Sequence, residues 1–119
     1  YWSKRRLAGN SLTIEEKTMR HAQIFQYDLT LDQTAYGPRF VDPYAQAIAD
    51  FPGLIRKTWM ADHLNGKFAS FYLWEGKEAM DAFMASPAIA QVAAEPFLKD
   101  LVITSLPVAE SASAITRGV

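Results

Sequence analysis

Residues 51–74 carry the clearest hydrophobic pattern in the chain, and the pattern predicts a β-hairpin. The residues on both sides of Asn65-Gly66 are typical of strands, in which successive side chains point to opposite faces. Asn-Gly favours a two-residue type I′ turn, because that turn needs a positive φ at both central residues. Such a turn fixes the cross-strand pairs as Leu64 with Lys67, His63 with Phe68, Ala61 with Ser70, Trp59 with Tyr72, and Lys57 with Trp74.

The predicted hairpin has two faces, and both are largely apolar at their centres. The first face carries Ile55, Lys57, Trp59, Ala61 and His63, with Phe68, Ser70, Tyr72 and Trp74 opposite. The second face carries Leu54, Arg56, Thr58, Met60 and Asp62, with Ala69, Phe71 and Leu73 opposite. A small protein rarely leaves a large apolar patch in water, so each face needs a covering layer.

The remaining elements follow from periodicity and from proline and glycine positions. Gly37-Pro38 interrupts the chain, Asp42 with Pro43 is typical of a helix start, and Pro52-Gly53 is typical of a helix end. The predicted order is a strand over 22–31, a helix from 42 to 51, the hairpin, a helix over 76–86, a short helix from Pro87 and a strand over 101–106.

This order of strand, helix, strand, strand, helix, strand predicts the α+β class. Two right-handed β-α-β units give a ferredoxin-like β-α-β-β-α-β sandwich, a four-stranded antiparallel sheet with both helices on one face. The uncovered face would still carry Leu54, Met60, Phe71 and Leu73. Pairing two such faces in a symmetric homodimer is the simplest way to bury them.

The chain of 119 residues fits one domain with two terminal segments. We assign 1–20 to an N-terminal arm, 21–108 to the ferredoxin-like domain and 109–119 to a loose C-terminal tail or partner-binding arm. Tyr1-Trp2 precedes the basic run at Lys4 in the arm. Two interpretations are open: the end of a membrane anchor, or a simple flexible arm. The expected location is the cytoplasm, or the cytoplasmic face of a membrane in the first case.

Composition narrows the chemistry. The sequence has no cysteine, which excludes disulfides and thiolate chemistry, and its two histidines argue against a multi-histidine metal site. The net charge of −1 argues against a nucleic-acid partner. We therefore expect neither a metal nor another cofactor.

Several short motifs resemble those of one family. Phe51-Pro52-Gly53-Leu54 leads to Lys57-Thr58-Trp59, followed by Gly66 and by Phe71-Tyr72-Leu73-Trp74. In this order they resemble the YdhR-type monooxygenases of the dimeric α+β barrel superfamily, over residues 22–108. The resemblance implies a dimeric α+β barrel related to antibiotic biosynthesis monooxygenases. Those enzymes oxidise aromatic polyketides without metal or flavin, in a pocket between sheet and helices.

The residues suggest how such a pocket would work. Trp59 and Tyr72 would hold a flat ring and orient its oxygen, since each has an apolar body and a polar tip. His63 would be the catalytic base, because its ordinary pKa lies near neutrality, and Asp28 is the alternative base. Tyr72, which would hydrogen-bond the ligand oxygen, is the second predicted catalytic residue. The other predicted ligand-binding residues are Trp74, Tyr44 and Phe83.

Two further points stay open at this stage. Lys57 would form a cation–π pair with Trp74 or meet an anionic group of a ligand. The function is either that of a monooxygenase or aromatic-ligand binder, or that of a non-catalytic dimeric scaffold that docks on a larger assembly through its arms. A cavity of roughly 300 Å³ or more beside Trp59 and Tyr72 would favour the first, and a filled core the second.

Overall fold

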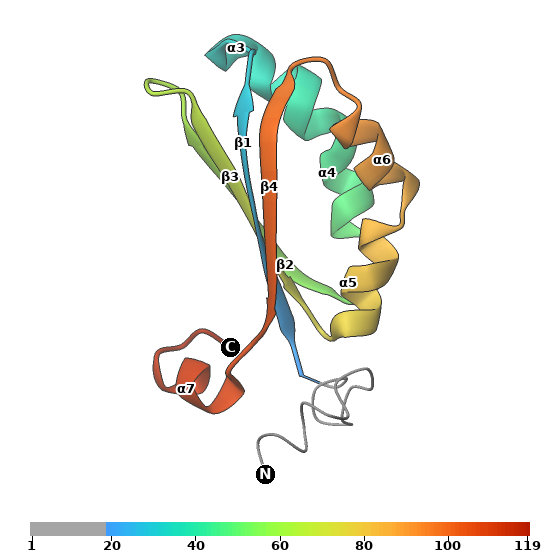
Figure 1. Cartoon of the computed structure of the whole chain (residues 1–119), viewed down its shortest axis with the longest axis vertical. Helices are drawn as coiled ribbons and strands as arrows, with labels where there is room; N and C mark the ends of the chain where they lie inside the picture. Colours follow the sequence, from blue (N-terminus) through green and yellow to red (C-terminus); the bar gives the residue numbers. More distant parts are fainter. Residues whose placement is uncertain (1–18) are drawn as a thin grey trace.

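A four-stranded antiparallel sheet forms the centre of the molecule (Figure 1). The computed structural model describes residues 19–119, so the expectations for Tyr1 to Arg6 lie outside the described residues. The strands are β1 (His21–Leu29), β2 (Leu54–Asp62), β3 (Lys67–Trp74) and β4 (Leu98–Pro107). Their spatial order is β2-β3-β1-β4, and every neighbouring pair is antiparallel. This is the ferredoxin-like topology, and the predicted fold class is confirmed.

One face of the sheet is covered by helices, on the right in Figure 1. The connection from β1 to β2 forms α3 (Gln33–Ala35), the π-helical turn η1 (Tyr36–Val41) and α4 (Asp42–Ala49). The connection from β3 to β4 forms α5 (Lys77–Met84) and α6 (Pro87–Ala93). Within residues 19–119 no helix is long and apolar enough to cross a membrane.

The first helical segment begins earlier than the sequence pattern predicted. Asp32 is the N-cap, and its carboxylate accepts a hydrogen bond from the backbone N–H of Ala35 at 2.9 Å. The predicted break at Gly37-Pro38 is wrong, because the wider turn of η1 takes in both residues. There the N–H of Asp42 donates to the carbonyl of Gly37, five residues back. Asp42 therefore lies inside a helical segment and is not its cap.

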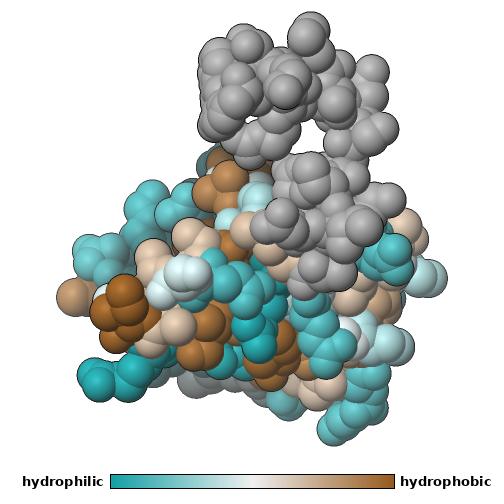
Figure 2. All heavy atoms as spheres, turned by 90° about the horizontal axis from the view of Figure 1, so that it is seen from below, coloured by the Kyte–Doolittle hydropathy of each residue, from teal (hydrophilic) through white to brown (hydrophobic). Residues whose placement is uncertain are grey.

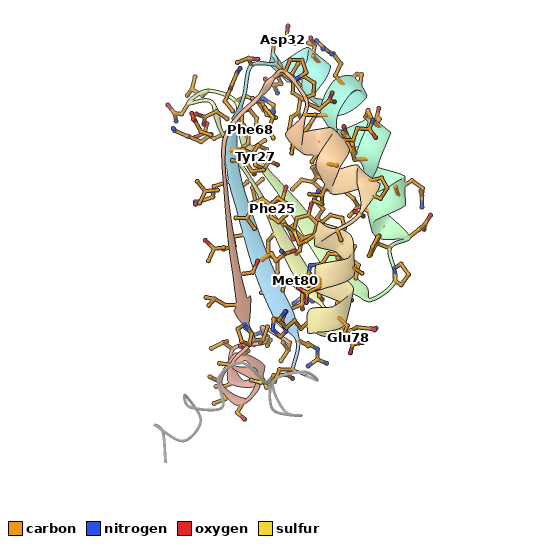
Figure 3. All side chains as sticks on the ribbon, turned by 45° about the vertical axis from the view of Figure 1, so that its right-hand side comes forward. Phe25, Tyr27, Asp32, Phe68, Glu78 and Met80 are labelled. Carbon is orange, nitrogen blue, oxygen red and sulfur yellow. The ribbon has the colours of Figure 1, made fainter. Side chains whose placement is uncertain are left out.

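Aromatic side chains fill the space between sheet and helices. Alternate residues of β1 point inward, and Phe25 and Tyr27 are seen there beside Phe68 of β3 (Figure 3). Further along β3, the fully buried Trp74 ring lies 4.9 Å from that of Phe83 in α5. Each buried ring removes a large apolar area from water, so this layer supplies most of the hydrophobic stabilisation.

The hairpin forms with a longer turn than predicted. Asp62 pairs with Lys67, so residues 63–66 are a four-residue loop in which only Gly66 has a positive φ, 66°. The Asp62 carboxylate accepts hydrogen bonds from the N–H and the side-chain amide of Asn65, at 3.2 and 2.9 Å. These bonds stabilise the wider loop in place of a type I′ turn.

The longer loop shifts the cross-strand pairs from Arg56 to Asp62 by two positions. Trp59 is opposite Ser70, and Lys57 is opposite Tyr72, so the predicted pairs Trp59–Tyr72 and Lys57–Trp74 are wrong. A shift by an even number leaves each residue on its face, because side chains alternate with a period of two. Both predicted faces are therefore retained over most of the hairpin.

The start of β2 is the exception. Leu54 pairs with Trp74 while Arg56 pairs with Leu73, so Ile55 is an extra residue in a β-bulge. The bulge moves Leu54 into contact with the core and leaves Ile55 38% exposed, the reverse of their predicted faces.

The C-terminal segment, predicted to be loose, forms the short helix α7 (Glu110–Ile115), which lies on the other side of the sheet from α4 to α6 (Figure 1). The Glu110 carboxylate binds the Arg20 guanidinium at 2.7 Å and its backbone N–H at 2.8 Å. Arg56 donates to the carbonyl of Gly118 at 3.0 Å. At this end of the molecule the surface mixes apolar and hydrophilic residues (Figure 2).

Candidate functional site

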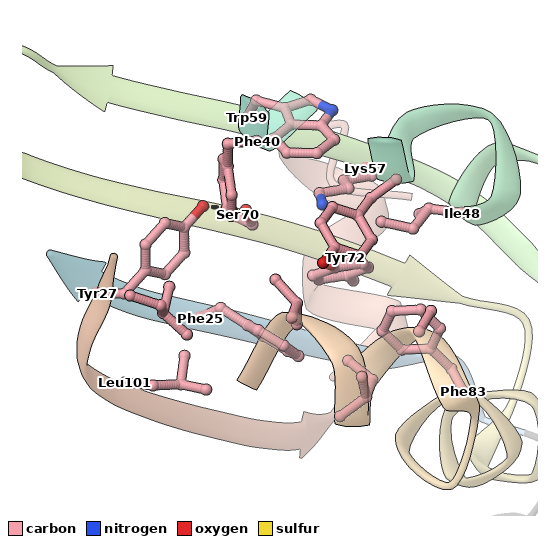
Figure 4. A pocket seen from close by; sticks show the side chains of 15 residues that line it. Phe25, Tyr27, Phe40, Ile48, Lys57, Trp59, Ser70, Tyr72, Phe83 and Leu101 are labelled. Atoms are coloured by element: carbon pink, nitrogen blue, oxygen red, sulfur yellow. Dashed lines mark hydrogen bonds between the residues drawn. The ribbon is translucent and has the colours of Figure 1, made fainter. Parts of the chain in front are cut away.

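A small cavity lies between the inner face of the sheet and the helices (Figure 4). All four strands and helices α4, α5 and α6 contribute to its wall. The wall is mostly aromatic and aliphatic. Its polar members are Lys57, Ser70, Tyr27, Tyr44 and Tyr72.

The volume of this cavity is about 30 Å³, far below the roughly 300 Å³ of an ordinary ligand pocket. A space of this size holds one or two water molecules. An aromatic ring therefore enters only if wall residues move. Of the three α-helices in the wall, α6 is the one without a buried residue, and it supplies Ala88, Ile89 and Val92.

The tyrosine hydroxyls of the wall are neutral at physiological pH. Burial raises the pKa of Tyr27 to about 12, although its hydroxyl hydrogen-bonds Ser70 Oγ at 2.8 Å. Burial also raises the pKa of Tyr72, and it raises that of Tyr44 to about 12, whose hydroxyl donates to Glu95 at 3.2 Å. These groups therefore act as hydrogen-bond donors and not as bases.

Lys57 is the one cationic side chain of the wall. Its Nζ lies 3.4 Å from the ring centroid of Trp59 and 4.7 Å from that of Tyr72 (Figure 4). Burial lowers the pKa of Lys57 from 10.5 to about 7. The ion pairs found among residues 19–119 use other cations, so no carboxylate compensates for this burial. The amine is thus partly neutral at neutral pH.

Sequence comparison identifies the family. A family model described as "Putative mono-oxygenase ydhR" matches residues 24–119. The chain belongs to this family. No curated protein matches the sequence.

Solved structures share the fold of this ydhR-family chain. SnoaB of Streptomyces nogalater, described as a cofactor-independent oxygenase, superimposes with a TM-score of 0.63 at 14% identity, covering 77% of this chain and 95% of SnoaB. A "putative antibiotic biosynthesis monooxygenase" of Deinococcus radiodurans gives 0.64 at 21% identity, covering 76% and 93%. Rv0793 of Mycobacterium tuberculosis gives 0.63 at 18% identity, covering 77% and 98%. At these identities the comparison shows the fold alone.

Four of the predicted site residues line the cavity, namely Trp59, Tyr72, Tyr44 and Phe83. Trp59 and Tyr72 lie on neighbouring strands, two positions out of the predicted register, and the side chain of Lys57 lies between them. The predictions for these four residues concern ligand binding and catalysis, and they stay predictions.

The other three predicted residues lie outside the cavity wall. His63 is in the hairpin loop, where its ring packs edge-on against Tyr36 at 5.0 Å and Phe68 at 5.4 Å. Trp74 donates its indole N–H to the side-chain carbonyl of Gln23 at 2.9 Å. Asp28 lies on the opposite face of the sheet, 3.8 Å from Lys67. A ligand in the cavity would not meet any of these three groups directly.

One polar residue of the region, Tyr36, was not assigned a role from the sequence, and Lys57 was given two open roles, a cation–π pair with Trp74 or contact with an anionic ligand group. Lys57 was placed on the correct face, but the type I′ register put it beside Trp74. The buried hydroxyl of Tyr36 has no hydrogen-bond partner within residues 19–119. Tyr36 and its aromatic neighbour Phe40 belong to η1, which the pattern did not predict, and its other aromatic neighbours are His63 and Phe68. Within the same residues no three His, Asp or Glu side chains gather as a metal site.

The environment of Lys57 predicts a pH-dependent stability. The unfolded chain binds a proton at Lys57 up to about pH 10.5, and the folded chain only up to about pH 7. Stability therefore rises with pH across this window, because the unfolded state binds more protons. Lys57→Met removes this dependence, so its stability advantage over the wild type should shrink by about 2 kcal/mol between about pH 7 and 9. Urea unfolding at several pH values measures this difference.

Lys67→Met is the matched control, because the Lys67 side chain is 74% exposed. The difference in the free energy of unfolding between Lys67→Met and the wild type should stay nearly constant over the same pH range. A constant difference for Lys57→Met as well would show that the Lys57 amine is well solvated.

Proposed function

We propose that this ydhR-family protein is a cofactor-independent oxygenase that binds small hydroxylated aromatic compounds between its sheet and helices. The observation that carries the proposal is the aromatic cavity wall, which contains a neutral tyrosine hydroxyl and an uncompensated amine. An apolar site with a few convergent polar groups is the usual form of a small-molecule site. Family membership and the shared fold with SnoaB support the same class of reaction.

The wall residues divide into ring-binding and oxygen-binding groups. Trp59 packs edge-on against Phe40 with 5.7 Å between ring centroids, and Lys57 Nζ lies 3.4 Å from the Trp59 ring centroid, so a ligand ring would contact Trp59 beside the amine. The hydroxyl of Tyr72 stays protonated and donates a hydrogen bond to the ligand oxygen. Once the ligand has lost its hydroxyl proton, the electron-rich anion reacts directly with molecular oxygen.

Ligand binding must enlarge the cavity of about 30 Å³. The short helix α6 forms one side of the cavity wall, and its wall residues Ile89 and Val92 are half-buried. Outward displacement of α6 would open space for one ring without breaking a strand pair.

We expect Trp59→Ala to weaken the binding of hydroxylated aromatics. Loss of one aromatic contact raises Kd by up to about tenfold beyond the effect of lost contact area. Calorimetry with a set of phenols and naphthols measures Kd, and an oxygen electrode measures turnover. The matched control is Leu64→Ala, which truncates a side chain 92% exposed in the hairpin loop and should leave Kd unchanged. Equal affinities of the two variants would remove Trp59 from the ligand site.

The small cavity favours a second candidate function, that of a non-catalytic dimeric scaffold. In that case the aromatic layer is only the hydrophobic core, and the open sheet face and terminal segments make the functional contacts. The same binding screen separates the two functions. Failure of every hydroxylated aromatic to bind the wild type would favour the scaffold.

A further inference from the structure

The Lys57 amine lies among aromatic rings of the cavity wall and forms no ion pair within residues 19–119. A buried ammonium group is normally paired with a carboxylate, because desolvation of an unpaired charge costs several kcal/mol. Here the Nζ is surrounded by the rings of Trp59 and Tyr72, at 3.4 and 4.7 Å. Cation–π contacts offset only part of that cost.

The groups that face Lys57 from the surrounding elements do not supply the missing negative charge. Strand β3 presents Tyr72 and Ser70, β1 presents Tyr27, and α4 presents Tyr44, all neutral hydroxyls at physiological pH. The wall residues of α5 and α6 are apolar. Glu95 is linked to the wall through the hydrogen bond that it accepts from Tyr44, but it belongs to no ion pair within residues 19–119.

We propose that Lys57 is the proton acceptor and anion-binding residue of this site, and that the site selects aromatic ligands with an acidic hydroxyl. This inference rests on the proposed function and names both its substrate class and its base. The side chain projects from the sheet into the cavity, where a bound ring would lie beside Trp59 and Tyr72 (Figure 4).

The proton balance of this step closes within the site. The neutral amine of Lys57 takes the hydroxyl proton of the ligand, so one O–H bond breaks and one N–H bond forms. The products are an ammonium and an aryloxide in contact, and the net charge of the site does not change. The aryloxide is the negative partner that Lys57 lacks in the free protein, and Tyr72 donates a hydrogen bond to it.

The decisive experiment uses 4-nitrophenol and 4-nitroanisole as probes. The two rings have nearly the same shape, but only nitrophenol has a proton to lose, and only its anion is yellow. Absorbance titrations with excess protein across neutral pH report how much of the bound nitrophenol is ionised. An opposite charge within about 4–6 Å lowers a pKa by 1–3 units, so ionisation in the wild type should be favoured at least about tenfold over Lys57→Met.

Three variants make the result specific. Lys57→Met should bind 4-nitroanisole as well as the wild type does, but should lose the enhanced ionisation of nitrophenol. Lys57→Arg keeps a permanent charge, so it should keep the ionised nitrophenol. With oxidisable phenols that are still protonated in water at the assay pH it should lose oxygen consumption by 10²–10⁴-fold, since guanidinium does not accept their proton. Lys67→Met, at an exposed site, should match the wild type in every measurement.

Each outcome has one meaning. Equal nitrophenol ionisation in the wild type and Lys57→Met would overturn the assignment of Lys57, while the aromatic site itself would stand. Full oxygen consumption by Lys57→Arg would overturn the proton transfer and leave only anion binding. If neither probe bound the wild type, the proposed function and this inference would both fail. Circular dichroism of each variant separates these results from unfolding.

Discussion

Gly53→Ala is expected to lower the free energy of unfolding by about 3 kcal/mol or more. Gly53 has a φ of +88°, in the left-handed region where a side chain costs about 1–2 kcal/mol. A Cβ atom built there would overlap the Cβ of Ala79 in α5, and relieving such an overlap costs a further 1–3 kcal/mol or so. The carbonyl of Gly53 also accepts the N–H of Glu75 at 2.8 Å, so a backbone shift at Gly53 disturbs the junction of β2 and β3.

Gly66→Ala separates the two causes. Gly66 also has a positive φ, 66°, but a Cβ atom there would meet no atom within 4 Å. The free energy of unfolding of Gly66→Ala should fall only by the cost of the positive φ, about 1 kcal/mol. Urea unfolding of both variants measures the difference. Equal losses would mean that α5 moves away from Gly53 at no cost, and that the close packing of α5 on the sheet is not rigid.

The fold was predictable because it depends on features that tolerate small errors. Side chains alternate between the two faces along a strand, so each strand residue is assigned to a face, and this assignment survives a register error of two positions. The order of strands and helices then leaves few topologies. Asp42-Pro43 and Ser86-Pro87 indicated the positions of α4 and α6 even though Asp42 proved not to be a cap.

The cavity was less predictable because it depends on which residues lie opposite one another on neighbouring strands, and not on the face of the sheet alone. The side chain of Asp62 stabilises a four-residue loop, and the Asn-Gly rule does not include that competing hydrogen bond. The resulting shift places Lys57 opposite Tyr72, where both contact the cavity. Alternation did place Lys57 on the inner face. An inward lysine with no acidic residue on the same face was the available signal.

The position of His63 was mispredicted because it also depends on where the hairpin strands end. On the inner face of an ideal hairpin it would have continued the row of Lys57 and Trp59. In the structure β2 ends at Asp62, so His63 belongs to the loop and its ring packs on Tyr36. Tyr36 belongs to η1, and no helical periodicity in the sequence indicated that turn. His63 was predicted to be the base only because the ordinary pKa of a histidine lies near neutrality, and its place in the loop keeps it out of the cavity wall.

The outer face of the sheet is the structural basis for the expected homodimer. Four large apolar side chains are exposed on it, namely Ile24, Met60, Val102 and Leu106, at 43%, 41%, 56% and 64%. Phe71 lies between Ile24 of β1 and Thr58 of β2, near the centre of this face. Leu73 of the same row is only 2% exposed, and it lines a surface hollow with Val119 at the end occupied by the C-terminal segment. The rest of the face has no cover within residues 19–119.

Phe71→Asp is expected to convert the protein from dimer to monomer. The wild type should sediment at twice 13.3 kDa at micromolar concentration, with the two outer faces in contact. A charge without a partner at the centre of that interface should weaken association by at least about 2–4 kcal/mol, or roughly 30- to 1,000-fold in Kd. Leu64→Asp is the matched control, because it adds the same charge at an apolar residue that is 92% exposed in the hairpin loop, and it should stay dimeric.

A wild-type monomer at micromolar concentration would contradict the dimer outright. A dimeric Phe71→Asp variant would move the interface to another surface, for which α7 and its exposed Ile115 are the next candidates.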